Sequence, residues 1–105
     1  MLSPEEIDGY HAILKALAHP TRIAIVERLL EGEQTAGEIF SLFSFDISTV
    51  SRHLSVLKNA GLISNRREGA SIIYNIATPG VASGLASAVN VLQEIRTSRD
   101  KTYRR

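Results

Sequence analysis

The chain has 105 residues, no cysteine and a formal net charge of +1, and its length is that of one domain, which we expect to span residues 1–105. The lack of cysteine excludes disulfides, thiolate metal sites and iron–sulfur clusters. No apolar run reaches the ~20 residues of a membrane span, and the acidic N-terminal segment is unlike a signal peptide, so we expect a cytoplasmic protein without a membrane partner.

Two helices are expected in the first 32 residues. Ser3 and Glu6 form a capping-box pattern at the start of the first helix. Apolar side chains then recur at helical spacing, namely Ile7, Tyr10, Ile13, Leu14 and Leu17. His19-Pro20 interrupts this helix, and a second one follows as far as a C-cap at Gly32. The apolar face of the second helix consists of Ile23, Val26, Leu29 and Leu30.

The next two helices have the spacing of a helix-turn-helix motif. Thr35 and Glu38 form a second capping box, which opens a short helix over residues 36–43. Asp46 is expected to cap a longer helix over residues 47–61, with an apolar face of Val50, Leu54 and Leu57. A short helix, a brief turn and a longer helix are typical of this motif.

After residue 61 the pattern changes to that of strands. Residues 62–67 and 71–77 predict two strands joined by a hairpin tip at residues 68–70, and Thr78-Pro79-Gly80 ends the hairpin. A last amphipathic helix is expected from about Val81 to Arg96, and the basic tail 97–105 is expected to fray. The order α-α-α-α-β-β-α predicts a mainly α protein with a small β-wing, which is a winged helix-turn-helix.

The two halves of the chain differ in charge. Residues 1–50 hold three basic and eight acidic side chains, whereas residues 51–105 hold nine basic and three acidic ones. A basic half on a nearly neutral chain indicates a polyanion as partner. Arg52 in the fourth helix can donate two hydrogen bonds to a guanine edge, and Arg66 and Arg67 flank the hairpin tip, where a wing meets phosphates or the minor groove. The alternative to DNA binding is a solvated helix face beside a charged turn. The presence of both features, in this order along the chain, favours DNA binding.

Three motifs occur in order along the chain: L-A-H-P-T-R, S-T-V-S-R-H-L-x-V-L-K-x-A-G-L-I and R-R-E-G-x-x-x-x-Y. With them, residues 10–96 resemble the ArsR family of winged-helix transcriptional repressors. The resemblance implies a palindromic operator in double-stranded DNA, a homodimer built from the first and last helices, and release by an inducer that the sequence does not identify. The residues expected to contact DNA are Ser48, Thr49, Ser51, Arg52, His53, Ser55, Lys58, Arg66, Arg67 and Ser71. Those expected at the dimer interface are Ile7, Tyr10, Leu14, Leu85, Val89 and Leu92.

The ligands of the family's familiar metal sites are missing. Thr35 and Gly37 stand where one site has cysteines, and of the four ligands of a second site only Glu94 remains. We therefore expect no metal site and no cofactor. We also expect no enzyme and no catalytic residue, because no phosphate loop, H-E-x-x-H or G-x-S-x-G motif is present. Ser44 departs from the family in another way, because it stands where a glycine is often found and would be strained in a left-handed turn.

The histidines leave one alternative open. We expect His19 to make a local hydrogen bond, and His53 to pack or bind a phosphate. His11 lies near several carboxylates, so an unfamiliar oxygen and nitrogen metal site remains an alternative. A winged helix that docks another protein is the other alternative to DNA binding.

Overall fold

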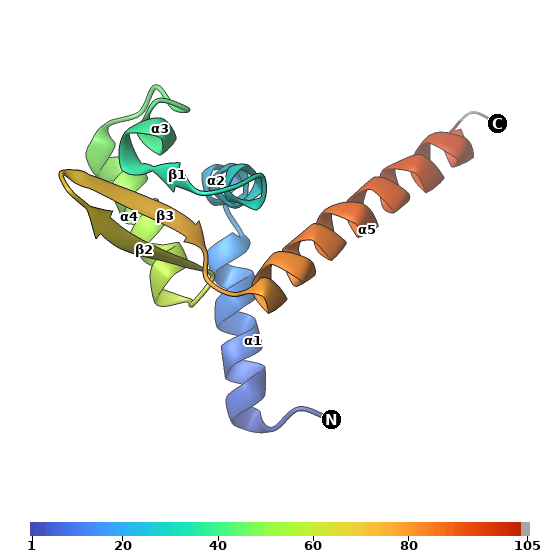
Figure 1. Ribbon diagram of the computed structural model, residues 1–105. Helices are drawn as coiled ribbons and strands as arrows, with labels where there is room; N and C mark the ends of the chain where they lie inside the picture. Colours follow the sequence, from blue (N-terminus) through green and yellow to red (C-terminus); the bar gives the residue numbers. More distant parts are fainter. Residues whose placement is uncertain (104–105) are drawn as a thin grey trace.

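The computed structural model describes the backbone of residues 1–103 and the side chains of residues 1–99 (Figure 1). Its elements are α1 (Pro4–Leu17), α2 (Pro20–Leu30), β1 (Gln34–Thr35), α3 (Ala36–Phe40), α4 (Ile47–Asn59), β2 (Ile63–Glu68), β3 (Ser71–Ile76) and α5 (Pro79–Tyr103). The predicted order of five helices and a hairpin is confirmed. One short strand, β1, was not expected.

Local hydrogen bonds explain where the first helices begin. Both predicted capping boxes are present: the backbone N–H groups of Glu6 and Glu38 donate to the hydroxyls of Ser3 and Thr35, and the two glutamate side chains accept from the cap backbone in return. His19 begins α2, and its Nδ1 accepts from the backbone N–H of Thr21 at 3.1 Å, which is the expected local role. Asp46 occupies the N-cap of α4, but its side chain makes no capping hydrogen bond.

The core lies where α2, α3 and α4 meet the hairpin. Its fully buried side chains are Ile25, Ile39, Val50, Leu54 and Leu57. Val26 and Leu29 of the predicted face of α2 are buried as well, whereas Ile23 of the same face is 50% exposed and lines a groove next to α5. The row Thr21, Ile25 and Leu29, with a spacing of four residues, faces the core instead, and this turns Ile23 outward.

The sheet is antiparallel, with the strand order β1-β3-β2. β1 pairs two residues only, Gln34 with Tyr74 and Thr35 with Ile73. So short a strand has no alternation to reveal it, which is why the sequence did not indicate it. The hairpin tip is also shorter than expected, because Glu68 pairs with Ser71 and leaves a two-residue loop in which Gly69 has a φ of +60°.

The last helix is longer than predicted at both ends. The hydroxyl of Thr78 accepts from the backbone N–H of Val81 at 3.1 Å, so α5 begins at Pro79, a residue that suits the first turn of a helix. It continues to Tyr103 rather than ending at Arg96, since neither glycine nor proline follows Gly84 to stop it. Residues 97–103 are thus helical where a frayed tail was expected, and residues 104–105 lie outside the described part. Figure 1 shows α5 leading away from the body.

The turns before and after α4 differ in backbone conformation. No non-glycine residue in the described part has a positive φ, so Ser44 carries none of the left-handed strain that was considered for it. Gly61, by contrast, has a φ of +81°. Its N–H donates to Lys58 O and that of Leu62 donates to Leu57 O, which is a Schellman motif at the end of α4.

We expect Gly61→Ala to lower the free energy of unfolding by about 1 kcal/mol. A Cβ at Gly61 meets no atom within 4 Å, so the whole cost comes from the left-handed backbone. Gly9 of α1 is the matched control, since its Cβ would also meet nothing and its φ is ordinary. Gly9→Ala should stabilise by roughly 0.5–1 kcal/mol. Urea unfolding at one protein concentration measures the stability of both variants. Equal changes in the two variants would contradict the assignment of the cost to the left-handed backbone of Gly61.

Candidate nucleic-acid interface

The face of α4 opposite the core is polar and exposed. Successive residues of a helix are about 100° apart, so Ser48, Arg52 and Ser55 fall on one line opposite Val50, Leu54 and Leu57. All three are exposed. Thr49 is exposed beside them and Ser51 is half-buried, so the structure gathers the predicted base-reading residues on one surface. Asn59 continues the same line and is exposed. It was not predicted, although its spacing of four residues from Ser55 is a signal for it.

One flank of α4 faces the wing. Lys58 Nζ donates to the Oδ1 of Asn65 in β2 at 3.1 Å, so the helix and the hairpin are joined through side chains. Arg67 lies on the same side of β2 as Asn65, because side chains two residues apart share a face of a strand. It is exposed and has no ion pair among the described residues. Ser71 is exposed at the start of β3.

Arg66 is bound to two carboxylates. Its NH1 and NH2 groups donate to Glu33 at 2.8 and 3.0 Å, and its Nε donates to Glu68 at 2.6 Å. The hydrogen bond from Arg66 lowers the pKa of Glu33, and the hydrogen bonds to Glu33 and Glu68 raise the pKa of Arg66. Arg66 therefore ties β2 to the segment before β1, and its guanidinium is less available to a phosphate than that of Arg67.

The other flank of α4 carries a histidine pair. The rings of His19 and His53 have centroids 4.4 Å apart and are tilted by 44°. His53 is half-buried, and burial lowers its pKa, with further contributions from the positive charges of His19, Arg22 and Arg52. His53 thus lies beside the predicted DNA face and contacts the N-terminus of α2.

We expect stability to fall as the pH falls below about 6.5, the ordinary pKa of histidine. The pKa of His53 is lower in the folded than in the unfolded chain, so the unfolded state takes up its proton first. Stability from this source is present above that pH and is lost on acidification. His53→Gln removes this titrating group, so the melting temperatures of the wild-type protein and the variant should depend differently on pH. Parallel curves between pH ~8 and ~5 would contradict this.

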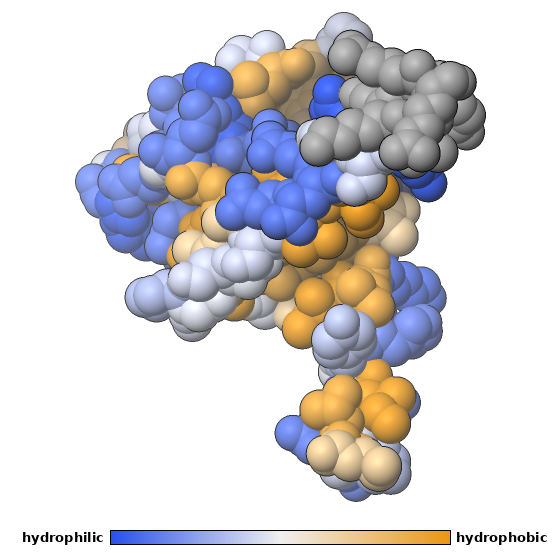
Figure 2. All heavy atoms as spheres, turned by 90° about the vertical axis from the view of Figure 1, so that its right-hand side faces the viewer, coloured by the Kyte–Doolittle hydropathy of each residue, from blue (hydrophilic) through white to orange (hydrophobic). Residues whose placement is uncertain are grey.

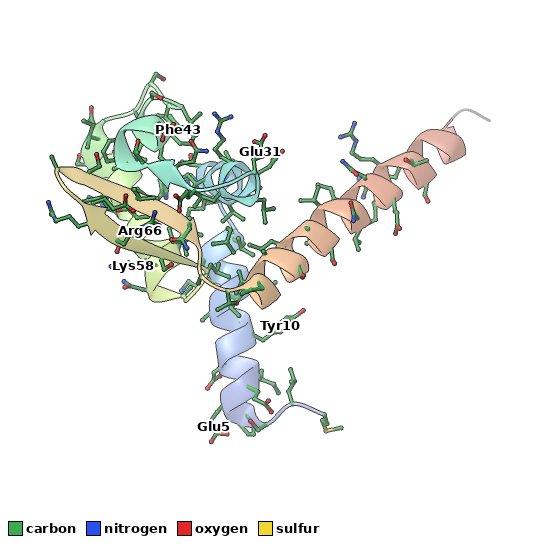
Figure 3. The ribbon with its side chains drawn as sticks, in the orientation of Figure 1. Glu5, Tyr10, Glu31, Phe43, Lys58 and Arg66 are labelled. Atoms are coloured by element: carbon green, nitrogen blue, oxygen red, sulfur yellow. The ribbon has the colours of Figure 1, made fainter. Side chains whose placement is uncertain are left out.

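Apolar side chains are exposed along α1 and α5. Ile7, Tyr10 and Leu14 of α1 are each more than half exposed, as is Leu92 of α5, and Leu85 and Val89 are half-buried. Figure 2 shows apolar surface gathered on this side of the molecule, and Figure 3 shows Tyr10 projecting from α1 toward the side of α5. A groove of about 210 Å³ lies between α2 and α5, lined by Ile23, Val26, Leu85, Val89 and Leu92 among others. A single protomer leaves this surface open to water.

The described residues offer no obvious metal centre. They contain no group of three or more His, Cys, Asp or Glu side chains that could hold an ion. His11 is exposed on α1, and Glu94 is exposed on α5. None of the helices in the described part is long and apolar enough to cross a membrane.

Known proteins share both the sequence and the fold. A family model described as "Bacterial regulatory protein, arsR family" matches residues 19–65, from the cap of α2 into β2. The HTH-type transcriptional regulator Rv0081 of Mycobacterium tuberculosis is 42% identical over 86 residues, which cover 81% of this chain and 75% of that protein. The transcriptional repressor SdpR of Bacillus subtilis is 33% identical over 78% of this chain and 91% of its own length.

Two solved structures agree with the winged helix-turn-helix fold. The crystal structure of M. tuberculosis Rv0081 superposes with a TM-score of 0.82 at 37% identity, covering 93% of this chain and 98% of that one. The winged helix-turn-helix DNA-binding domain Mb0332 of Mycobacterium bovis is described as homodimeric and as a possible ArsR-family regulator. It superposes with a TM-score of 0.81 at 32% identity over 89% of both chains.

Proposed function

This chain belongs to the arsR family of bacterial regulatory proteins, and we propose that it is a homodimeric repressor that binds a palindromic operator in double-stranded DNA. The exposed face of α4 carries the proposal. There Arg52 has no ion pair among the described residues, and the small hydroxyls of Ser48 and Ser55 beside it allow close approach to a groove. A guanidinium in this position suits bidentate contact with a guanine.

The wing supports the same function through phosphate contacts. Arg67 lies on the side of the hairpin that faces α4, and Lys58 of α4 contacts that hairpin, so both would meet one DNA backbone beside the recognition helix. Arg66 acts through Glu33 and Glu68, and we assign it to holding the wing in position.

The exposed apolar surface of α1 and α5 supports dimerisation through these two helices. One recognition helix reads few bases, whereas a two-fold dimer reads two half-sites. Ala82, Ala86 and Ala88 with Gly84 keep α5 narrow enough for close approach of a second helix. The homodimeric state described for Mb0332 supports this assignment.

Selection of bound DNA from a random duplex pool tests the proposal. We expect a two-fold symmetric consensus with half-site centres about 10 base pairs, or one helical turn, apart. A stable dimer without salt-sensitive DNA binding would contradict it and would favour a module that docks another protein.

We further propose that the protein is a cytoplasmic regulator without enzymatic activity, metal or cofactor. Among the positions of the familiar metal sites only Glu94 is a ligand, and one carboxylate is too few for Zn²⁺ or Ni²⁺. A ligand selective for the folded dimer raises its melting temperature. We expect no such rise with Zn²⁺, Ni²⁺ or Co²⁺, and a saturable rise would restore the site near His11 as a candidate.

A further inference from the structure

We propose that the flank of α4 away from the wing is a phosphate clamp, in which Arg22 and His53 hold a second DNA backbone. This inference rests on the proposed function, because it assumes that α4 enters a groove of DNA. We call the cluster of His19, Arg22, Arg52 and His53 the basic flank.

The position of the basic flank follows from the helical period. His53 lies between the buried line of α4 and its outward line, on the side away from Lys58. Lys58 contacts the wing through Asn65, whereas His53 contacts His19 at the start of α2. The outward face of α4 therefore has Lys58 on one side and the basic flank, with Arg22, on the other.

No described carboxylate forms an ion pair with the basic flank. Burial lowers the pKa of His53, and the positive charges of Arg22 and Arg52 lower it further. Arg22 has no ion pair in the described part of the chain, and its Nε is buried without a hydrogen-bond partner there. Arg28 and Arg66 differ in this respect, since Arg28 pairs with Glu31 and Arg66 with Glu33 and Glu68. Arg22 is only half-buried, so the outer part of its unpaired guanidinium can take an anion from outside the protein as its partner.

A DNA phosphate is the anion that this geometry favours. The major groove is about 12 Å wide and is bordered by two phosphate backbones, so a helix inside it presents its two flanks to opposite strands. A helix seated in this way would present Lys58 and Arg67 to one strand and Arg22 and His53 to the other. Half-buried His53 can donate one N–H to a phosphate oxygen while Arg22 supplies the charge.

The salt dependence of operator binding tests the clamp. Each phosphate contact contributes about 0.9 to the slope of log K against log salt. Arg22→Gln should therefore reduce the slope by about 1.8 in a symmetric dimer, and should weaken operator and scrambled duplexes alike. Arg22→Lys, which keeps the charge, should retain the slope. Arg28→Gln on the same helix is the matched control and should leave the slope unchanged. A folded Arg22→Gln dimer with the wild-type slope would overturn the clamp.

A scan of single methylphosphonate substitutions in the operator provides a test in the wild-type protein. We expect sensitive phosphates on both sides of the major groove of each half-site, with those on one side losing their effect in Arg22→Gln. Sensitive phosphates on one side only would overturn the clamp and leave the proposed function intact. Stabilisation of the dimer by inorganic phosphate, without phosphates on both sides in the scan, would assign the basic flank to a free anion and also overturn it. Absence of any DNA binding by the wild type would instead overturn the proposed function.

Discussion

Arg52→Ala is expected to remove the preference for one base in each operator half-site, at a cost of about 1–3 kcal/mol, or roughly 5- to 150-fold in affinity, for that contact. Arg52 is the long donor side chain on the outward line of α4, and no described carboxylate competes for it. Titrations with the selected operator, single-base variants and a scrambled duplex measure the effect. The variant should bind the operator more weakly but the scrambled duplex nearly as before.

Arg67→Ala is the matched control for this result. Arg67 is another exposed arginine without an ion pair among the described residues, but it lies on the wing and is assigned to a phosphate. Its loss should weaken all duplexes by a similar factor and lower the salt slope. An equal loss on operator and scrambled duplex for Arg52→Ala would remove Arg52 from base reading.

The features that could be predicted are those written in neighbouring residues. The capping boxes at Ser3 and Thr35 join residues three apart, and the outward and buried lines of α4 repeat every three or four residues. Such patterns place a helix and its faces without knowledge of the rest of the chain. The helix-turn-helix, the wing and the exposed polar face of α4 were accessible for this reason.

The features that were missed depend on distant partners. β1 exists because Gln34 and Thr35 meet β3 some forty residues later, and the choice of Ile25 over Ile23 for the core depends on how α2 lies against α4 and the sheet. The bond between Arg66 and Glu33 spans 33 residues. No local pattern distinguishes that paired arginine from its unpaired neighbour, Arg67.

This pairing changes what the charge asymmetry means. The basic half of the chain suggested a single cationic surface, but Arg66 is neutralised by one carboxylate of the acidic half and one of its own hairpin. The unpaired charge around α4 comes instead from Arg52, Lys58 and Arg67, together with Arg22 from the acidic half. Proximity in the fold, rather than position in the chain, decides which cations remain available to DNA.

Leu92→Glu is expected to separate the dimer and, with it, to abolish tight operator binding. Leu92 is 58% exposed in the protomer, so the change should leave the fold of each protomer largely intact. In the proposed dimer the substitution would bury a carboxylate in an apolar interface. Because the dimer is two-fold symmetric, each protomer would contribute one such carboxylate. Leaving a charge unpaired in such a place costs about 3–5 kcal/mol, so dimer dissociation should increase by more than about 100-fold.

Ser87→Glu is the control for Leu92→Glu, because Ser87 is exposed on the opposite side of α5 and the substitution adds the same charge to the same helix. Sedimentation at several protein concentrations measures the dimer, and titration with the selected operator measures its consequence. We expect Ser87→Glu to remain dimeric. Leu92→Glu should become monomeric with an unchanged far-ultraviolet circular dichroism spectrum. Because a monomer has only one recognition helix, its remaining affinity should resemble that for a single half-site. A dimeric Leu92→Glu protein with full operator affinity would show that the interface does not include the face of α5 that carries Leu85, Val89 and Leu92.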